Sequence, residues 1–202
     1  MERRRVVIVG GGFGGVYAAI ELERTLARDP NVEVTLVNRE NFFLFTPMLH
    51  EVAASDLDLT HIVNPIRKLV KRVRFVNAEV EAIDLERRTV RIVHGDQEHH
   101  HELPYDQLIL ALGSITNFYD LPGLAAGALT MKSLGDAIHL RNRVIAHLEE
   151  ADFERDPARR RRLLTVVVAG GGFSGVETAA AVNDLMRESL RYYPSLSEGD
   201  IR

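Results

Sequence analysis

Two short apolar runs dominate the hydrophobic pattern of the chain, and each is followed at once by clustered glycines and a helical pattern of small residues. The first run is Val6 to Val9 and the second is Val166 to Ala169. Residues 10–20 read GGGFGGVYAAI and residues 170–180 read GGGFSGVETAA, so the chain contains an internal repeat. The pattern predicts two units, each made of a strand, a glycine turn and a helix.

The first of these units continues into a second strand. Val16, Ala19 and Ile20 recur at helical spacing, and the Asp29-Pro30-Asn31 segment breaks the helix. Residues 32–37 are rich in valine and alternate as a strand does. The first unit is therefore predicted to be a βαβ unit.

The rest of the chain is predicted from shorter patterns. Residues 108–112 are wholly apolar, which is typical of a strand buried on both faces of a parallel sheet. Loop and short helix are expected at 41–71, and a strand at 74–76. An antiparallel meander follows, with strands at 80–83 and 89–93 and a turn at Gly95-Asp96. The second half is expected to contain a linker at 114–130, an amphipathic helix at 133–154, a basic lead-in at 159–162, and a helix at 176–191 that packs through Ala179, Ala180, Val182 and Leu185.

These elements predict an α/β fold. A Rossmann-like domain with a parallel sheet and an antiparallel meander is expected at 1–118. A linker with the amphipathic helix follows at 119–162, and a second Rossmann domain opens at 163–202. By the logic of the first unit another strand should begin near Ile201, so the second domain is interpreted as truncated.

Composition narrows the classes of function. The net charge is −4, which argues against nucleic acid as a partner, because phosphate binding needs a concentrated positive field. The chain has no cysteine, which excludes disulfides, thiolate metal ligands and cysteine nucleophiles within it. The apolar run after the basic start is too short for a signal peptide, and no stretch is long enough to span a membrane. A cytoplasmic location is therefore expected.

The glycines of the first loop have the spacing of a dinucleotide-binding turn. Gly10 permits a tight turn, Gly12 lets the backbone approach a pyrophosphate, and Gly15 allows the helix to pack closely on the strand. The N-terminus of the following helix offers N–H groups to phosphates. Because a strand, a helix and another strand surround the loop in the right order, dinucleotide binding is favoured over a ligand-free glycine turn. The second loop repeats this spacing at Gly170, Gly172 and Gly175.

The residue that meets the adenosine ribose departs from the usual pattern. Such units commonly carry an acid at the end of the second strand, and Asn38 stands there instead. A carboxamide also hydrogen-bonds ribose hydroxyls, but without charge. Asn38 is favoured by its position and Glu40 is the alternative. Arg39 is either a contact to the adenosine side or a solvated cation.

Five stretches of the chain follow the order of a known family. They are the loop Gly10 to Gly15, NRENFFLFTPMLHEVAA, YDQLILALGSITNFYDLPG, MKSLGDA and VVVAGGGFSGVETAA. Together they resemble the type II NADH dehydrogenases (NADH:quinone oxidoreductases), and the chain looks like the N-terminal half of such an enzyme. The resemblance implies FAD in the first Rossmann domain, NADH at the second, and hydride transfer from NADH to the flavin. It further implies that two electrons then pass to a quinone without proton pumping.

The resemblance also implies where the enzyme sits and which residues act. It implies attachment to the inner face of the cytoplasmic membrane through a C-terminal region, often as a homodimer. Glu177 is implied to lie close to the hydride and quinone chemistry; the other interpretation is an acid stabilised by the helix dipole. The implied cofactor contacts are Gly10, Gly12, Phe13, Gly14 and Gly15 at the FAD pyrophosphate, Asn38 and Arg39 at the adenosine ribose, Thr46 and Pro47 near the flavin ring, Val80 at the adenine, Ala111, Leu112 and Gly113 beside FAD, and Gly170, Gly172 and Gly175 at the nicotinamide nucleotide.

Two other functions stay open, and no metal site is expected. His94, His99, His100 and His101 cluster near the meander, but adjacent strand residues point to opposite faces and converge poorly on a metal. One alternative function is a related flavin reductase with another acceptor; the cysteine-dependent disulfide and sulfide:quinone reductases are disfavoured. The other alternative is an inactive dinucleotide-binding remnant, which bound flavin and turnover would exclude.

Overall fold

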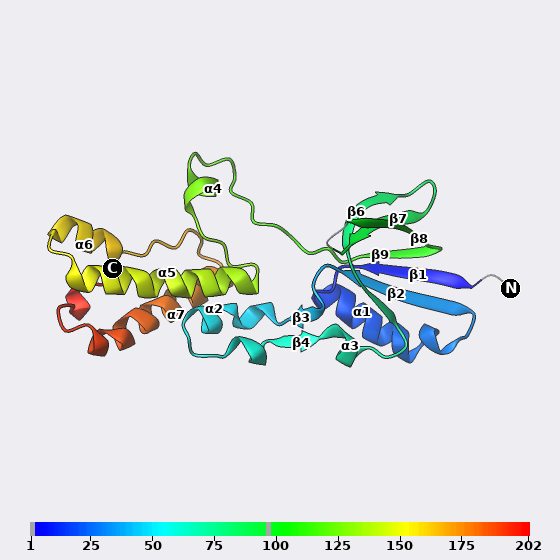
Figure 1. Cartoon of the computed structure of the whole chain (residues 1–202), viewed down its shortest axis with the longest axis horizontal. Coiled ribbons are helices and arrows are strands. Elements are labelled where there is room, and N and C mark those ends of the chain that lie inside the picture. Colours follow the sequence, from blue (N-terminus) through cyan, green and yellow to red (C-terminus); the bar gives the residue numbers. More distant parts are fainter. Residues whose placement is uncertain (1–2, 96–97) are drawn as a thin grey trace. The chain divides into compact units, whose positions relative to one another are not determined.

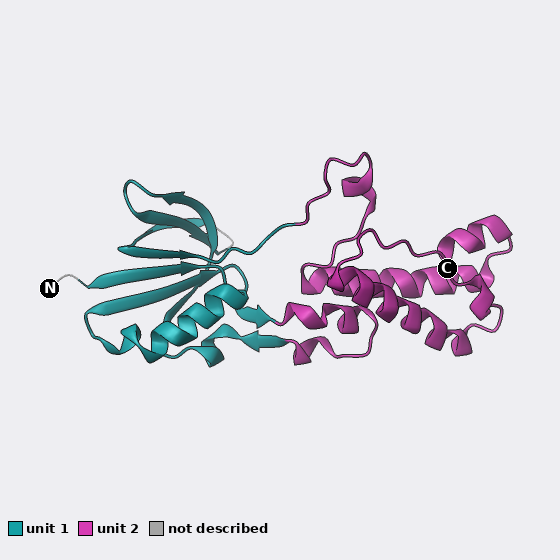
Figure 2. Cartoon of the chain, turned by 180° about the vertical axis from the view of Figure 1, so that it is seen from behind, with its two compact units in different colours: residues 1–44, 63–115 teal, residues 45–62, 116–202 magenta. Residues whose placement is uncertain are grey.

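The computed structural model describes residues 3–95 and 98–202, and the chain divides into two compact units (Figure 2). Unit 1 comprises residues 1–44 and 63–115, and unit 2 comprises residues 45–62 and 116–202. The α/β class, with a parallel sheet and separate antiparallel strands, is confirmed (Figure 1). The turn expected at Gly95-Asp96 extends outside the described residues.

Unit 1 holds every strand of the described residues. The strands are β1 (Arg4–Val9), β2 (Val32–Asn38), β3 (Phe42–Leu44), β4 (Val63–Pro65), β5 (Arg74–Asn77), β6 (Glu79–Asp84), β7 (Thr89–His94), β8 (His99–Pro104) and β9 (Gln107–Leu110), and the helices are α1 (Phe13–Arg24), α3 (Ile66–Leu69) and the 3-10 turn Leu26–Arg28. A four-stranded parallel sheet runs in the order β5-β2-β1-β9. Its β1-α1-β2 portion is the predicted βαβ unit.

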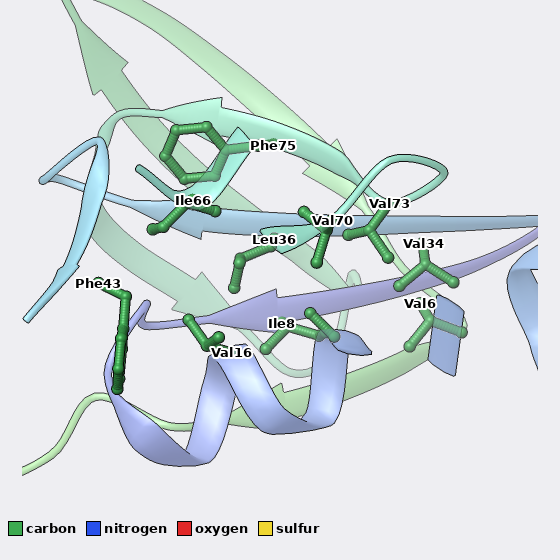
Figure 3. Close-up of a cluster of buried hydrophobic side chains, with 11 residues drawn as sticks. Val6, Ile8, Val16, Val34, Leu36, Phe43, Ile66, Val70, Val73 and Phe75 are labelled. Atoms are coloured by element: carbon green, nitrogen blue, oxygen red, sulfur yellow. The ribbon is translucent and has the colours of Figure 1, made fainter. Parts of the chain in front are cut away.

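Both faces of the parallel sheet are buried, which explains why its strands read as continuous apolar runs. On one face Ile8 and Leu36 pack against Val16 of α1 (Figure 3). On the other face Val9 and Val37 pack with residues of β7 and with Tyr105. Successive residues of each strand therefore supply two different cores.

The antiparallel meander is confirmed and has one strand more than the sequence predicts. Its order is β6-β7-β8, with a register irregularity between Val80 and Ala82. The third strand, β8, is largely exposed and rich in histidine, so it shows no apolar alternation. Its backbone ladder with β7 holds it in place. The segment at 41–71, expected as loop and short helix, also contains the antiparallel pair β3-β4, whose three-residue strands are too short to show a period.

Unit 2 is helical in the described residues. Its elements are α2 (Leu49–Ala53), α4 (Leu124–Gly127), α5 (Leu134–Phe153), α6 (Pro157–Leu163) and α7 (Phe173–Ser189), with 3-10 turns at Thr46–Met48, Leu59–His61, Leu190–Tyr192 and Glu198–Asp200. The amphipathic helix expected at 133–154 is α5, and its Val144 and Leu148 pack against Val182 and Met186 of α7. Among the described residues no helix is long and apolar enough to cross a membrane.

The apolar run at 166–169 is not a strand, which corrects the prediction for the second unit. Val167 is 84% exposed, although the corresponding residue of the first unit is buried. A strand exists only where a neighbour completes its backbone ladder, and no strand stands in the described part of unit 2. At the edge of the run, Val166 donates its N–H to the carbonyl of Arg202, and Arg202 donates its N–H to the carbonyl of Leu164.

Three smaller expectations are also corrected. Ala179 and Ala180 are exposed, because α7 turns Thr178, Ala181 and Met186 toward its helical neighbours rather than toward a sheet. The basic lead-in at 159–162 lies within α6, which starts at Pro157 and is capped by the Asp156 carboxylate. The strand expected at 108–112 ends at Leu110.

Candidate functional site

The first glycine loop is shaped by close backbone approaches at two of its glycines. Gly10 follows β1 with φ +104°, and a Cβ there would lie 2.2 Å from the carbonyl oxygen of Ala111. A Cβ on Gly15 would lie 1.7 Å from the carbonyl oxygen of Gly10. Neither approach leaves room for a side chain, so the loop can close on itself and on the end of β9 only with glycine at both positions.

The middle of the loop is open on the side where a ligand would approach. A Cβ on Gly12 would meet no protein atom within 4 Å. Gly12 is also the N-cap of α1, which has no side-chain cap and no acidic residue in its first turn. The partial positive charge at this helix end is therefore not neutralised by a carboxylate of the same turn, and the geometry suits an anionic group.

Gly11, which the G-x-G-x-x-G pattern does not specify, is also constrained, unlike Gly12. Its N–H donates to Oδ1 of Asn38 at 2.8 Å. A Cβ on Gly11 would lie 2.6 Å from the Asn38 side chain. The signal for it was present in the sequence as three consecutive glycines, but the G-x-G-x-x-G pattern leaves the second position unspecified.

The other predicted contacts of the first loop lie around it in unit 1. The Phe13 ring stands edge-on to Phe43, with centroids 4.9 Å apart. Ala111 donates its N–H to the Val9 carbonyl at 2.8 Å, and its methyl group would be 3.4 Å from a Cβ on Gly14. The remaining predicted FAD contacts in this unit are the exposed Leu112, Gly113 with φ +75°, the half-buried Val80 on β6 and the exposed Arg39.

The second glycine loop repeats the internal geometry of the first. Gly170 has φ +134°, and a Cβ on Gly175 would lie 2.1 Å from the Gly170 carbonyl oxygen. Gly172 is the N-cap of α7, again without a side-chain cap, and a Cβ there would meet nothing within 4 Å. The turn and the helix of the repeat are thus formed, whereas its preceding strand is not.

Glu177 lies on α7 beside a histidine that the sequence analysis did not single out. Nδ1 of His50, on α2, is 3.7 Å from Oε2 of Glu177, and Nε2 of His50 is 3.3 Å from Oε1 of Glu51. The His50 side chain is 18% exposed and that of Glu177 is 47% exposed. One imidazole therefore stands between two carboxylates. Nothing in the sequence indicated this contact, because the two residues are far apart in the chain.

The other titratable groups around α2 are mostly acidic. Burial raises the pKa of the Asp56 carboxyl, and the negative charges of Glu51, Glu188 and Asp184 raise it further. Thr46 and Pro47, predicted near a flavin ring, form the exposed turn that leads into α2. Within unit 2, the structure thus packs α2, the helix that follows Thr46 and Pro47, against the helix of the second glycine loop.

The histidines of the meander form no metal site in the described residues. His94 and His101 stack with ring centroids 4.9 Å apart, and His100 instead pairs with Glu81 at 2.9 Å. Across residues 3–95 and 98–202 no three histidine, aspartate or glutamate side chains are arranged to hold a metal ion.

Comparison with known proteins places these loops in a family. The pyridine nucleotide-disulphide oxidoreductase family matches residues 4–190, which include both glycine loops. The chain belongs to this family. Among curated members similar to it, a type II NADH:quinone oxidoreductase of Mycobacterium tuberculosis is 36% identical over 94% of this chain and 40% of its own length. A demethylphylloquinone reductase of Synechocystis is 36% identical over 92% of this chain and 44% of its own length.

Solved structures agree with this membership in the pyridine nucleotide-disulphide oxidoreductase family. NDH2 of Plasmodium falciparum, in complex with NADH, superposes with a TM-score of 0.87 and 25% identity, covering 99% of this chain and 41% of that one. A persulfide reductase described as NAD-dependent, from A. fulgidus, superposes with a TM-score of 0.70 and 25% identity, covering 90% of this chain and 32% of that one. The chain thus spans about two fifths of the length of the curated relatives it matches.

Proposed function

We propose that this chain is the part of a type II NADH:quinone oxidoreductase that binds FAD and receives NADH. The observation that carries the proposal is the pair of glycine loops with equivalent geometry in one chain, since each turn has the shape that receives a dinucleotide pyrophosphate. The similarity to relatives named as NADH:quinone oxidoreductases favours NADH and a quinone over other donors and acceptors.

The residues of the first loop fit the diphosphate of FAD. The helix end at Gly12 supplies partial positive charge, and the open space at Gly12 lets the backbone approach. We propose that Phe13, Gly14 and Gly15 complete this cradle. Asn38 and Arg39 are proposed at the adenosine ribose and Val80 at the adenine. Ala111, Leu112 and Gly113 are proposed along the cofactor at the end of β9, with Thr46 and Pro47 near its ring.

The second loop is proposed to receive NADH through Gly170, Gly172 and Gly175. Bound flavin supplies the two-electron chemistry that accepts hydride and reduces quinone. Glu177 is proposed to lie beside this chemistry, and His50 to hold the Glu177 carboxylate in place through the contact at 3.7 Å. By the same resemblance we propose that the enzyme works as a homodimer on the inner face of the cytoplasmic membrane, which cofractionation with membranes and the mass in solution would test.

The first experiment is a titration of the purified chain with FAD, followed by anaerobic addition of NADH. We expect the visible flavin band to appear on the protein and to bleach when NADH is added. Gly12→Ala should abolish flavin uptake, because its methyl group occupies the space proposed for the pyrophosphate. Gly127→Ala is the matched control, since a Cβ there also meets no protein atom within 4 Å but lies in α4.

Two outcomes would contradict the proposal. One is a cooperatively folded chain that takes up no flavin at saturating FAD. The other is uptake that Gly12→Ala and Gly127→Ala leave equally intact, because the glycine loop would then not be the binding site. Bleaching by NADH without later oxidation by added quinone would instead support a flavin reductase with another acceptor.

A further inference from the structure

Two asparagines stand in register at the carboxyl ends of neighbouring parallel strands. Asn38 ends β2 and Asn77 ends β5, and they are paired in the parallel ladder. Oδ1 of Asn38 accepts the Gly11 N–H at 2.8 Å, and its Nδ2 donates to the Glu40 carbonyl at 2.9 Å. Nδ2 of Asn77 donates to the carbonyls of Asn38 at 3.1 Å and Arg39 at 2.7 Å.

These hydrogen bonds satisfy backbone carbonyls just beyond the point where the parallel ladder of β2 and β5 ends. At the end of β2 the chain turns away, and its carbonyls would otherwise lose their partners. The two carboxamides, together with the Ala78 N–H on the Asn38 carbonyl at 3.0 Å, bind the carbonyls of residues 38, 39 and 40 in succession. The turn and the glycine loop are thereby tied to the same two strands.

A carboxamide is required for this arrangement, whereas the carboxylate usual at the end of the second strand is not suited to it. A carboxylate at position 38 would accept the Gly11 N–H but could not donate to the Glu40 carbonyl. A carboxylate at position 77 could donate to neither carbonyl. After its two bonds, Asn38 still has one N–H and one lone pair, which match a ribose hydroxyl that both donates and accepts.

We propose that Asn38 and Asn77 form an amide latch that holds the glycine loop and the turn 38–40 in the shape that receives the adenosine end of a dinucleotide. Asn77 is a positioning residue within this latch, and the main task of Asn38 is to hold Gly11. The inference rests on the proposed function only in naming the adenosine nucleotide. The latch itself is a property of the ligand-free chain.

The latch is tested without ligand by hydrogen exchange of backbone amides, followed by NMR. Asn77→Ala should speed exchange of the Gly11 and Ala78 N–H groups about tenfold, the change expected from loss of one hydrogen bond. Asn38→Asp should keep the protection of Gly11 because it keeps the acceptor, whereas Asn38→Ala should remove it. Asn64→Ala, at an exposed position on β4, is the matched control and should change neither amide. Unchanged exchange in a folded Asn77→Ala protein would overturn the latch.

Its role toward the nucleotide is tested by titration with ADP and with FMN. Asn77→Ala should weaken binding of ADP about tenfold or more and leave binding of FMN, which has no adenosine, within about twofold. Faster Gly11 exchange with unaltered ADP affinity would overturn the role in nucleotide binding while leaving the latch as a structural device. Failure of the unsubstituted chain to bind ADP would contradict the proposed function and the adenosine assignment together, and the exchange result would still decide whether the latch exists.

Discussion

The glycines of the first loop are not equivalent, as their different expected roles in the motif imply. Gly15 is required by the protein itself, since a methyl group there would collide with the Gly10 carbonyl. Gly12 faces open space, so its lack of a side chain matters only to something that approaches from outside. The structure therefore separates a glycine kept for packing from one kept for a ligand.

This separation predicts opposite behaviour for two alanine substitutions. Gly15→Ala should lower the free energy of unfolding by about 3 kcal/mol or more, because the clash of its methyl group with the Gly10 backbone carbonyl cannot be relieved by a side-chain rotation. Gly12→Ala should change it by about 1 kcal/mol at most and act on flavin uptake instead. Urea unfolding measures the free energy of unfolding of both variants. Equal loss of stability in the two variants would contradict the distinction.

A second prediction at the residue scale concerns Asp56. Its folded-state pKa is raised by burial and by the carboxylates of Glu51, Glu188 and Asp184, so the ionised form is disfavoured in the folded protein. Asp56→Asn should raise stability near neutral pH by up to about 0.5 kcal/mol, the size usual for exposed charges. The gain should vanish as the pH falls from the raised pKa toward the ordinary value for aspartate. Thermal unfolding across this pH range would show a constant stability difference between Asp56→Asn and the unsubstituted chain if the pKa of Asp56 were not raised.

At the scale of elements, the N-terminus of α5 is fixed by hydrogen bonds between residues that are close in the sequence. Ser133 Oγ accepts the Asp136 N–H at 3.1 Å, and the Asp136 carboxylate accepts the Ser133 N–H at 2.9 Å, which completes a capping box. Burial alone would raise the pKa of the Asp136 carboxyl, but the N–H groups of Lys132 and Ser133 outweigh it and hold this pKa below its ordinary value.

The capping box predicts how much Ser133 contributes to the free energy of unfolding and how the contribution of Asp136 depends on pH. Ser133→Ala should cost about 1 kcal/mol, as loss of an N-cap does. The contribution of Asp136 is present above the pKa of the unfolded chain and is lost as the pH falls through the lower folded pKa. The destabilisation by Asp136→Asn should therefore shrink in acid. Asn142→Ala, exposed on the same helix, is the control and should be nearly neutral.

A second device at this scale ties α1 to the start of β5. The Glu23 carboxylate accepts the N–H groups of Lys71 at 2.5 Å, Arg72 at 2.8 Å and Val73 at 3.3 Å. Burial opposes ionisation of Glu23, but these three donors outweigh it and lower its pKa. Because Glu23 precedes its partners by about fifty positions, the helical spacing of Val16, Ala19 and Ile20 gives no indication of this contact.

At the scale of the whole molecule, the two copies of the repeat differ in whether the apolar run before the glycine loop forms a strand. Residues 6–9 are buried in a four-stranded sheet, whereas residues 167–169 form no strand. Native-state hydrogen exchange should therefore find the amides of residues 6–9 among the slowest and those of 167–169 among the fastest. Comparable protection of the two runs would show that a ladder forms at 166–169 in solution.

Prediction from the sequence succeeded where the determining interactions are local. The apolar run of β1, the alternation along β2, the helical spacing of Val16 and Ala19, and the break at Asp29-Pro30-Asn31 identified the βαβ unit, because these signals act within a few residues. The glycine spacing located both loops for the same reason. The antiparallel strand β8 was missed because its histidines carry no apolar period and only the ladder with β7 defines it.

The sequence by itself therefore determined the class of fold, the two glycine turns and the family. Tertiary structure decided whether each apolar run became a strand, since a strand needs a partner that lies elsewhere in the chain. It also decided that Asn38 bonds to Gly11, that Asn77 supports it, and that His50 faces Glu177. These contacts join residues separated by many positions, and composition, periodicity and spacing contain no information about which distant groups will meet.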